Sequence, residues 1–542
     1  MQSRDTFDYI VIGAGSAGCV LANRLSASGQ HRVLLLEAGG KDRHPWIHIP
    51  LGYGKLFTNA RVNWLYNSEP EPELNNRQII QPRGKVLGGS SSINGLLYVR
   101  GQSQDFDHWR QLGNTGWSYE DVLPYFRKAE DQARGADDFH GVGGPLAVAD
   151  VPEAHPLCEA FIEAAQEAGF PRNDDFNGAT QEGAGYFQVT SRNGRRCSTA
   201  VGYLRPARSR VNLEVVPNAL TTRILFEGRR AVGVEYRLGG ETRVAHASGE
   251  VIVSAGAINS PQLLQLSGVG PAELLKSFGI PIVADTNVGN DLQDHFQVRF
   301  AYRCTEPITM NDVLGSLRNR LAAGLRYVFT RKGLLAISAG YAGGFFRTDP
   351  SLASPDVQVH VIMFSADKIG EKFHPFPGFI ISVCQLRPDS RGHVRIKSTD
   401  PALPPAIQPR YLSAPRDRDV MVSGMKLMRR IMSQPAIARY VAEERLPGPK
   451  CQSDADFLAY ARETGTTIFH PTSTCRMGPD PAAVVDERLR VRGLEGLRVV
   501  DGSIMPTVVS GNTNAAIIMI AEKGADMILA DAKAGVGVAR AA

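Results

Sequence analysis

The sequence lacks the features that mark membrane-spanning, secreted or nucleic-acid-binding proteins. Its 542 residues contain no run of 18 or more apolar residues, so we expect no transmembrane segment. We also expect no secretory leader, because the apolar run at 9–12 leads directly into a glycine loop. The formal net charge is only +5 and no basic block occurs, which argues against a nucleic-acid partner.

Cysteine is also scarce, and its pattern excludes two kinds of protein. The seven cysteines are odd in number and form no CxxC pair or metal-finger spacing, and the 12 histidines are dispersed. We therefore predict free thiols, no metal site and a cytoplasmic location. The chain is 43% hydrophobic and 21% charged, which excludes intrinsic disorder and is typical of a globular protein with a sizeable core.

The first forty residues carry a dinucleotide-binding pattern. A β-branched run at 7–12 enters the loop GAGSAG at 13–18, then a helical stretch, and a second apolar run that ends in Glu37. The loop glycines, Gly13, Gly15 and Gly18, allow a tight turn, a close approach to pyrophosphate and close helix–strand packing. The helix N-terminus attracts the diphosphate, and Glu37 can accept ribose hydroxyls. Glu37 argues against NADP and leaves NAD and FAD open.

Three further blocks of small residues favour FAD, because they let the backbone approach a large planar ligand. They are residues 82–95, the turn 255–261 after a predicted strand, and the turn 501–506, which leads towards a helix from about 512 to 530. The complete set of predicted cofactor contacts is Gly13, Gly15, Ser16, Ala17, Gly18, Glu37, Ala38, Trp64, Arg83, Gly84, Val86, Gly89, Ser90, Asn94, Gly95, Ala255, Gly256, Asp501, Gly502, Asn514 and Ala515.

From about residue 7 to 530 the chain resembles the glucose–methanol–choline (GMC) oxidoreductase family. Besides the fingerprint, the matching stretches are PRGKVLGGSSSIN, SAGAINSPQLLQLSGVGP (254–271), VGNDLQDH (288–295), HPTSTCRMG (470–478) and DGSIMPTVVSGNTNAA (501–516). Within the family the chain is most similar to bacterial FAD-linked dehydrogenases of alcohols, choline, L-sorbose or polyethylene glycol.

The resemblance implies an α/β protein (α+β overall) with two domains. A discontinuous Rossmann-like FAD domain would comprise 1–155, 193–300 and 470–535, and an antiparallel substrate domain flanked by helices would comprise 156–192 and 301–469. The residues themselves agree. Alternation at 357–361, 379–383 and 393–397 predicts strands, and apolar spacing over 417–432 predicts a helix.

The resemblance also implies a catalytic pair, His470 and Asn514, facing flavin N5 and the substrate hydroxyl. A neutral imidazole can take the hydroxyl proton as general base. The carboxamide would donate a hydrogen bond to the same oxygen. Family members with covalent flavin carry a histidine where this chain has Ile93, so we expect FAD to be bound non-covalently.

The activity expected from this resemblance is oxidation of a neutral primary alcohol to its aldehyde, with electrons passed to a quinone-like acceptor. An O₂-using alcohol oxidase, a choline dehydrogenase and a hydroxynitrile-lyase-like enzyme remain alternatives, although no carboxylate with an aromatic cage for choline can be identified. Residues 367–378, Tyr53 and Phe57 are candidates for a lid or pocket wall. Peripheral contact with the inner membrane face also remains open.

Overall fold

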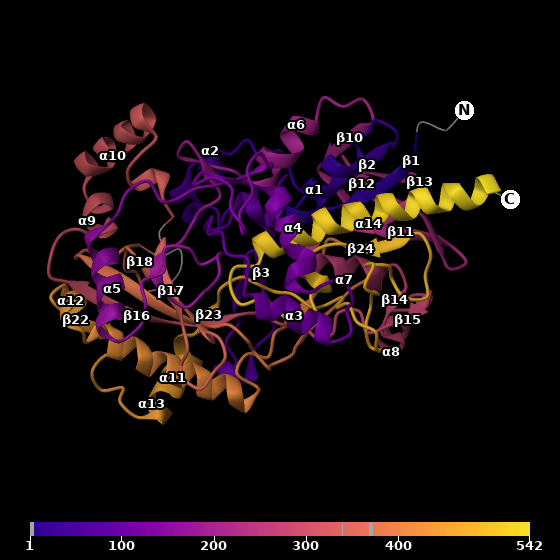
Figure 1. Cartoon of the computed structure of the whole chain (residues 1–542). Coiled ribbons are helices and arrows are strands. Elements are labelled where there is room, and N and C mark those ends of the chain that lie inside the picture. The colour runs from indigo at the N-terminus through magenta and orange to yellow at the C-terminus, as the bar shows by residue number, and fades with distance from the viewer. Residues whose placement is uncertain (1–4, 339, 368–371, 542) are drawn as a thin grey trace.

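A computed structural model of the chain describes residues 5–338, 340–367 and 372–541, and side chains up to 534. Its first sheet is built on parallel strands in the order β10-β2-β1-β13, and β24 pairs with β13 (Figure 1). Their bounds are Leu213–Pro217, Val33–Glu37, Thr6–Ile12, Glu241–Val253 and Leu497–Val499. β1 and β2 are buried apolar runs, as parallel strands covered on both faces require.

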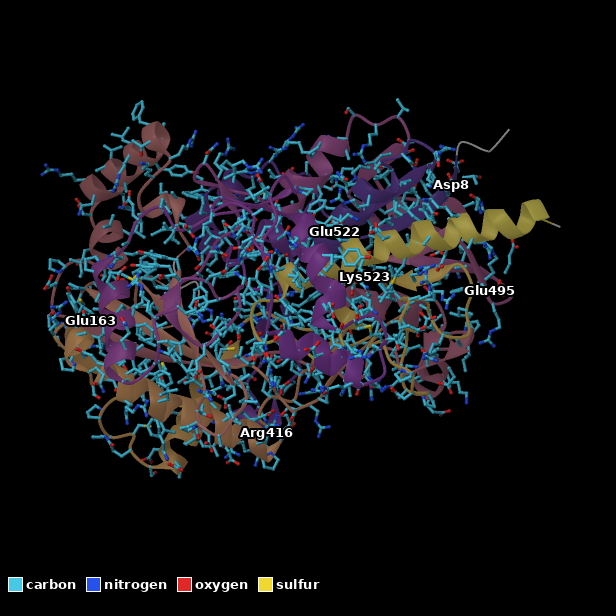
Figure 2. The ribbon with its side chains drawn as sticks, in the orientation of Figure 1. Asp8, Glu163, Arg416, Glu495, Glu522 and Lys523 are labelled. Atoms are coloured by element: carbon cyan, nitrogen blue, oxygen red, sulfur yellow. The ribbon has the colours of Figure 1, made fainter. Side chains whose placement is uncertain are left out.

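The first sheet continues antiparallel and is covered by helices from both ends of the chain. β12 (Arg230–Leu238) pairs with β13, and β11 (Ala219–Glu227) pairs with β12. Helices α1 (Ser16–Leu25) and α14 (Asn514–Ala541) pack against each other. Glu522 lies on α14 (Figure 2) and is buried. It accepts two hydrogen bonds from Arg24 of α1, at 2.8 and 2.6 Å. Sequence-distant segments thus form one core around the nucleotide-binding pattern.

The second sheet is antiparallel throughout, with strand order β22-β16-β19-β18-β17-β7. In that order the strands span Val441–Leu446, Phe296–Cys304, Gly378–Gln385, Val357–Ile362, Ala342–Phe346 and Gly183–Tyr186. Helix α11 (Pro415–Met432) packs on β19. The predicted strands at 357–361 and 379–383 and the predicted helix over 417–432 are therefore confirmed. Of the strand predicted at 393–397, only β20 (His393–Arg395) forms, and it pairs with β21 (Ala406–Gln408) in a separate two-stranded sheet.

The two faces of the second sheet differ in polarity because side chains alternate along each strand. Val298 and Val383 are directly paired and lie in the apolar cluster that includes the methionines of α11. On the opposite face, Arg299 pairs with Ser382, which pairs with His360. Gln358 lies two residues from His360 on the same face and donates a hydrogen bond to Asn512 at 3.2 Å. The polar face is therefore turned towards the segment that precedes α14.

The second sheet begins earlier than the predicted domain boundary at 301, because β16 already begins at Phe296. Residues 296–300 therefore pair within the second sheet, and the two-domain division otherwise remains a prediction. Residues 1–4, 339 and 368–371, which fall inside the predicted domains, lie outside the described part of the chain. Within that described part, no helix is both long and apolar enough to cross a lipid bilayer.

Candidate active site

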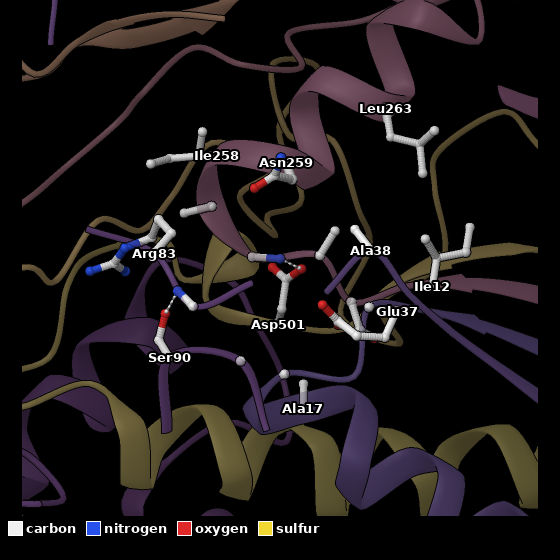
Figure 3. Close-up of a pocket in the computed structure, with 18 of the residues that line it drawn as sticks. Ile12, Ala17, Glu37, Ala38, Arg83, Ser90, Ile258, Asn259, Leu263 and Asp501 are labelled. Carbon is white, nitrogen blue, oxygen red and sulfur yellow. Dashed lines mark hydrogen bonds between the residues drawn. The ribbon is translucent and has the colours of Figure 1, made fainter. Parts of the chain in front are cut away.

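A long cavity runs between the carboxyl ends of the parallel strands and the loops that the sequence singles out (Figure 3). Its position is that of ligand sites in open parallel sheets, where the strand-to-helix turns converge. Fifteen predicted cofactor contacts line it: Gly13, Gly15, Ser16, Ala17, Glu37, Ala38, Trp64, Arg83, Gly84, Gly89, Ser90, Ala255, Gly256, Asp501 and Gly502. Segments that are hundreds of residues apart in the sequence thus share one cavity wall.

Glycines in these loops let two backbone segments approach so closely that a side chain would not fit between them. Gly13 has a φ of +94°, and a Cβ there would lie 2.7 Å from the Ser254 carbonyl oxygen. A Cβ at Gly18 would lie 1.8 Å from the Gly13 carbonyl oxygen, so α1 can cross the turn only with glycine here. A Cβ at Gly89 would lie 2.6 Å from the Gly15 Cα. The loop 82–95 therefore packs directly on the dinucleotide-binding turn.

Glu37 lies at the end of β2, where the ribose of a bound dinucleotide would lie. Its two carboxylate oxygens accept the backbone N–H groups of Ala14 and Gly39, at 2.8 and 2.7 Å. Burial raises the pKa of Glu37 to about 7, although these two hydrogen bonds act in the opposite direction. The carboxylate is thus fixed in orientation, and its remaining lone pairs can accept hydroxyl donors in the cavity.

Asp501 joins two turns of the cavity wall. Its side chain accepts a hydrogen bond from the backbone N–H of Gly256 at 2.8 Å (Figure 3). It also accepts one from the Ser260 hydroxyl at 2.5 Å. It also accepts the Ser503 backbone N–H at 2.8 Å. Gly256 has a φ of +84°, and no atom lies within 4 Å of the Cβ it lacks. The turn between β13 and α7 (Gly256–Leu266) therefore presents open backbone to the cavity.

Six predicted contacts do not line the cavity: Gly18, Val86, Asn94, Gly95, Asn514 and Ala515. Gly18 lies behind the turn, and Val86 is buried in a small apolar cluster with Ile93. The Asn94 side chain accepts a hydrogen bond from buried Arg196 at 2.5 Å. The position of a residue in a motif predicts that it lies near the cofactor, but it does not show where its side chain points.

Sequence reasoning also missed residues that line the cavity, chief among them Thr221, Ser254, Ile258, Asn259, Thr513 and Ile517. The buried hydroxyls of Thr221 and Ser254 have no hydrogen-bond partner among the residues that the structure describes. Buried hydroxyls normally find partners, so these two indicate that a polar ligand belongs in the cavity. Thr221 comes from β11, which carried no recognisable motif.

His470 stands on a strained loop that is held from two sides. The preceding residue, Phe469, has a φ of +73°, which is unusual for a side chain of its size. Arg83 donates a hydrogen bond to the Phe469 carbonyl at 2.6 Å, and Asp294 accepts the His470 backbone N–H at 2.8 Å. These two contacts stabilise the backbone conformation that presents the imidazole.

A chain of hydrogen bonds determines which nitrogen of His470 carries the proton. The Nε2 atom of His295 lies 2.9 Å from the Leu386 carbonyl oxygen, which can only accept, so this nitrogen is the donor. Neutral His295 therefore has its lone pair on Nδ1, which lies 3.0 Å from Nδ1 of His470. His470 must donate there, which leaves its Nε2 unprotonated. The structure thus provides a base with a defined lone pair.

The electrostatic surroundings keep this imidazole neutral. Burial lowers the pKa of His470 well below its usual value, and His295, Arg83 and His360 lower it further. Burial likewise lowers the pKa of His295 to about 4. Both rings are therefore neutral at physiological pH, which is the protonation state that the hydrogen-bond chain requires.

The carboxamide that contacts His470 is Asn512, two residues before the predicted Asn514. Asn512 Nδ2 lies 3.3 Å from His470 Nε2, and its Oδ1 accepts from Gln358. Asn514 is the first residue of α14, as expected, but its Oδ1 accepts a 2.7 Å hydrogen bond from Ser16 in the dinucleotide-binding turn. The segment SGNTNAA offers two asparagines, and the structure places different partners around each.

Asp294 and His295 also contact His470. The sequence identified the motif that contains them but not these two contacts. Asp294 and His295 are the last residues of VGNDLQDH, which was recognised only as a matching block. The structure brings both against His470, one through the backbone and one through the ring. An adjacent Asp-His pair just before a strand was the available signal.

Aromatic side chains lie beside the base. The ring of Phe57 lies 5.3 Å from that of Phe469 and 5.6 Å from that of Tyr53, the latter in the short helix η1 (Pro50–Lys55). Tyr53 and Phe57 do not line the cavity described above, and their place in a pocket wall remains a prediction. Of the predicted lid at 367–378, residues 368–371 lie outside the described residues.

Comparison with known proteins gives a consistent result over nearly the whole chain. Residues 7–297 and 388–521 match the N- and C-terminal domains of GMC oxidoreductases. The chain is 43% identical to "Alcohol dehydrogenase [acceptor]" of Pseudomonas putida, covering 96% of each protein. It is 45% identical to "Choline dehydrogenase, mitochondrial" of Homo sapiens, covering 97% of this chain and 90% of the relative.

A solved FAD-dependent oxidoreductase from Chaetomium thermophilum has the same fold. It superposes with a TM-score of 0.89 at 27% identity, over 97% of this chain and 100% of the neighbour. The similarity therefore extends over both sheets. The resemblance inferred from the motifs is confirmed: the chain belongs to the glucose–methanol–choline (GMC) oxidoreductase family of FAD-dependent enzymes.

Proposed function

We propose that this protein oxidises a neutral primary alcohol to its aldehyde, with His470 as general base and FAD as the cofactor. The observation that carries the proposal is the fixed lone pair on His470 Nε2, beside the Asn512 amide. A neutral alcohol is a poor hydride donor, whereas its alkoxide is a good one. A base whose pKa is lowered by burial stays unprotonated and ready to accept the hydroxyl proton.

FAD, when bound, supplies the hydride acceptor. The residues that would hold it fit the group: open backbone at Gly15 and Gly256, a fixed carboxylate at Glu37 and unpartnered hydroxyls at Thr221 and Ser254. We propose non-covalent attachment. Ile93, at the position where some relatives carry a linking histidine, is buried among apolar side chains and cannot form such a bond.

The chain's own residues then divide the proton chemistry between them. His470 Nε2 accepts the hydroxyl proton, and the resulting imidazolium is stabilised because its Nδ1–H already donates to His295. Asn512 Nδ2 is placed to donate to the same substrate oxygen as it gains negative charge. Gln358 holds the amide in this orientation by donating to Asn512 Oδ1.

The charges near His470 favour a neutral substrate over choline. The charged residue that acts on His470 is the cation Arg83, and Arg299 acts on the neighbouring His360. Asp294 is already occupied, since it accepts hydrogen bonds from the His470 backbone and from the hydroxyls of Thr467 and Tyr411. A quaternary ammonium would meet the like charges of these two arginines here. Choline oxidation stays as the second candidate, because relatives are named for it.

Anaerobic bleaching of the flavin by a panel of alcohols tests this proposal. We expect aliphatic and benzylic primary alcohols to reduce the flavin and choline to do so at least tenfold less efficiently, in line with the loss of about 1.4 kcal/mol that one poorly matched charge contact produces. If no alcohol bleaches the flavin, a lyase that keeps it oxidised would be favoured. If choline reduces the flavin faster than the other alcohols do, choline oxidation becomes the favoured function.

The electron acceptor is tested on the same preparation. We propose a quinone-like acceptor, at or near a membrane surface, rather than O₂. Reoxidation of reduced enzyme by a soluble quinone analogue should be much faster than reoxidation in oxygen-saturated buffer. Comparable rates with stoichiometric peroxide would instead identify an oxidase.

His295 is proposed as a positioning residue, because it contacts the base and not the substrate. We expect His295→Leu to slow flavin reduction about 10- to 100-fold, since His470 could then place its proton on Nε2. His295→Gln, whose amide oxygen can accept from His470, should restore most of the rate. Equal loss of rate in the Leu and Gln variants would reduce His295 to a structural role.

A further inference from the structure

Helix α10 (Leu317–Thr330) carries a stripe of apolar side chains that nothing in the described structure covers. The helix lies at the periphery of the molecule, with α9 (Met310–Gly315) at its base (Figure 1). The α10 stripe consists of Leu317, Leu321, Leu325, Val328 and Phe329, which are 77, 65, 49, 59 and 81% exposed. Their spacing places them on one side of a helix. They account for five of the fourteen large apolar side chains that are exposed in the described part of the chain.

The opposite side of α10 is attached to the protein, so the stripe points outwards. Tyr327 is buried, and its hydroxyl donates to the Gly194 carbonyl oxygen at 3.0 Å. Arg326 forms an ion pair with Glu153 at 2.5 Å. These contacts hold the helix in place, and the stripe can meet another surface without any rearrangement.

The charges around the stripe are all of one sign. Between residues 313 and 333 the chain has no aspartate or glutamate, but it has five cations: Arg318, Arg320, Arg326, Arg331 and Lys332. Arg326 alone of these five has an acidic partner among the residues that the structure describes. The other four are exposed and lie on or beside the stripe. An apolar face with basic flanks matches a surface that is apolar inside and anionic outside.

We propose that α10 docks this protein on the surface of an anionic lipid bilayer, with the α10 stripe inserted between the acyl chains and its arginines at the headgroups. The helix has 14 residues, too few to span a bilayer, so it would lie in the interface. A second copy of the chain is a poorer occupant, because two such faces would bring Arg318 and Arg320 against their equivalents.

The docking site lies next to the aromatic wall of the active site. The turn η5 (Leu334–Ala336), which follows α10, packs on η1, the segment that carries Tyr53. Tyr53 in turn contacts Phe57, and Phe57 contacts Phe469 beside the base. This part of the inference rests on the proposed function: docking would bring the active-site side of the enzyme to a bilayer in which a quinone acceptor or an apolar alcohol dissolves.

Sedimentation of the holoenzyme with lipid vesicles tests the inference. We expect binding to phosphatidylcholine vesicles that contain phosphatidylserine, and weaker binding without phosphatidylserine or at high salt. Leu321→Glu/Phe329→Glu should lower the vesicle affinity about tenfold or more, because it removes two apolar anchors and adds two charges. Arg318→Glu/Arg320→Glu should abolish the preference for phosphatidylserine. Val142→Glu/Val211→Glu, at positions 54 and 104% exposed outside α10, is the matched control and should bind as wild type does.

Failure of the wild-type enzyme to bind these vesicles, or equal binding by the Leu321→Glu/Phe329→Glu variant, would overturn the inference. A concentration-dependent dimer that this variant abolishes, without vesicle binding, would also overturn it and identify a second copy as the occupant. Flavin bleaching by a water-soluble alcohol without vesicles reports on the proposed function separately. Normal bleaching with no vesicle binding therefore removes only the docking proposal.

Discussion

His470→Gln is expected to lower the rate of flavin reduction by an alcohol about 10²- to 10⁴-fold, the range that a positioned general base supplies. Glutamine keeps a polar side chain of similar reach but cannot accept the hydroxyl proton. FAD binding should persist, because His470 does not line the cavity that holds the predicted cofactor contacts. Anaerobic stopped-flow measurement of flavin bleaching gives the rate directly, without dependence on the acceptor.

The pH profile of the wild-type enzyme provides an independent check on His470. Burial lowers the pKa of this imidazole, so the neutral base predominates at every pH above its usual value near 6.5. The rate should therefore be level from about pH 6.5 upwards and should fall only as the pH decreases through the lowered pKa. A limb centred above pH 7 would be inconsistent with this base.

A matched histidine variant separates catalysis from general loss of stability. His155, the residue preceding helix α5 (Pro156–Glu167), accepts the backbone N–H of Leu157 and lies outside the site. His155→Gln should leave the rate of flavin reduction within about twofold, even if loss of the cap costs about 1 kcal/mol of stability. Equal loss of rate in both variants would show that the effect of His470→Gln is not specific to the base.

The second large effect on the rate of flavin reduction is expected from substitution of Asn512. Asn512→Ala should slow flavin reduction about 10²- to 10³-fold, equivalent to about 2.7–4 kcal/mol, because one preorganised donor to the developing alkoxide is lost. Asn514→Ala removes the hydrogen bond from Ser16 instead and should cost less than tenfold in this rate. Both side chains are asparagines at the same helix end, so each variant controls for the other.

The relative rates of the Asn512→Ala and Asn514→Ala variants decide which asparagine supplies the catalytic carboxamide. If Asn514→Ala is the more damaging variant, the pair inferred from the motif, His470 and Asn514, is correct and the contact of Asn512 with His470 is incidental. Asn512→His should retain more activity than Asn512→Ala, because an imidazole N–H can also donate a hydrogen bond to the substrate oxygen. Retained FAD absorbance in all three variants shows that the rates refer to loaded enzyme.

The part of the cavity wall that carries the dinucleotide-binding pattern could be predicted largely from sequence because that pattern is local. A β-branched run, a glycine loop, a helix start and an acid at the next strand end occupy consecutive positions, and each of Gly13, Gly15 and Glu37 lines the cavity. The residues missed there, such as Thr221, come from a strand that only the order of the sheet brings to the cavity. Asn94 does not line the cavity for a related reason, since buried Arg196 holds its side chain elsewhere.

By itself, the sequence determined the family, the parallel sheet with its dinucleotide turn, the strands at 357–361 and 379–383 and the helix over 417–432. These are properties of residue spacing along one element. The tertiary structure alone decided that Asn512 contacts His470, that His295 sets its tautomer and that α10 has one uncovered face. Those facts depend on side-chain direction and on segments distant in the chain, and spacing along a single strand or helix carries no information about either.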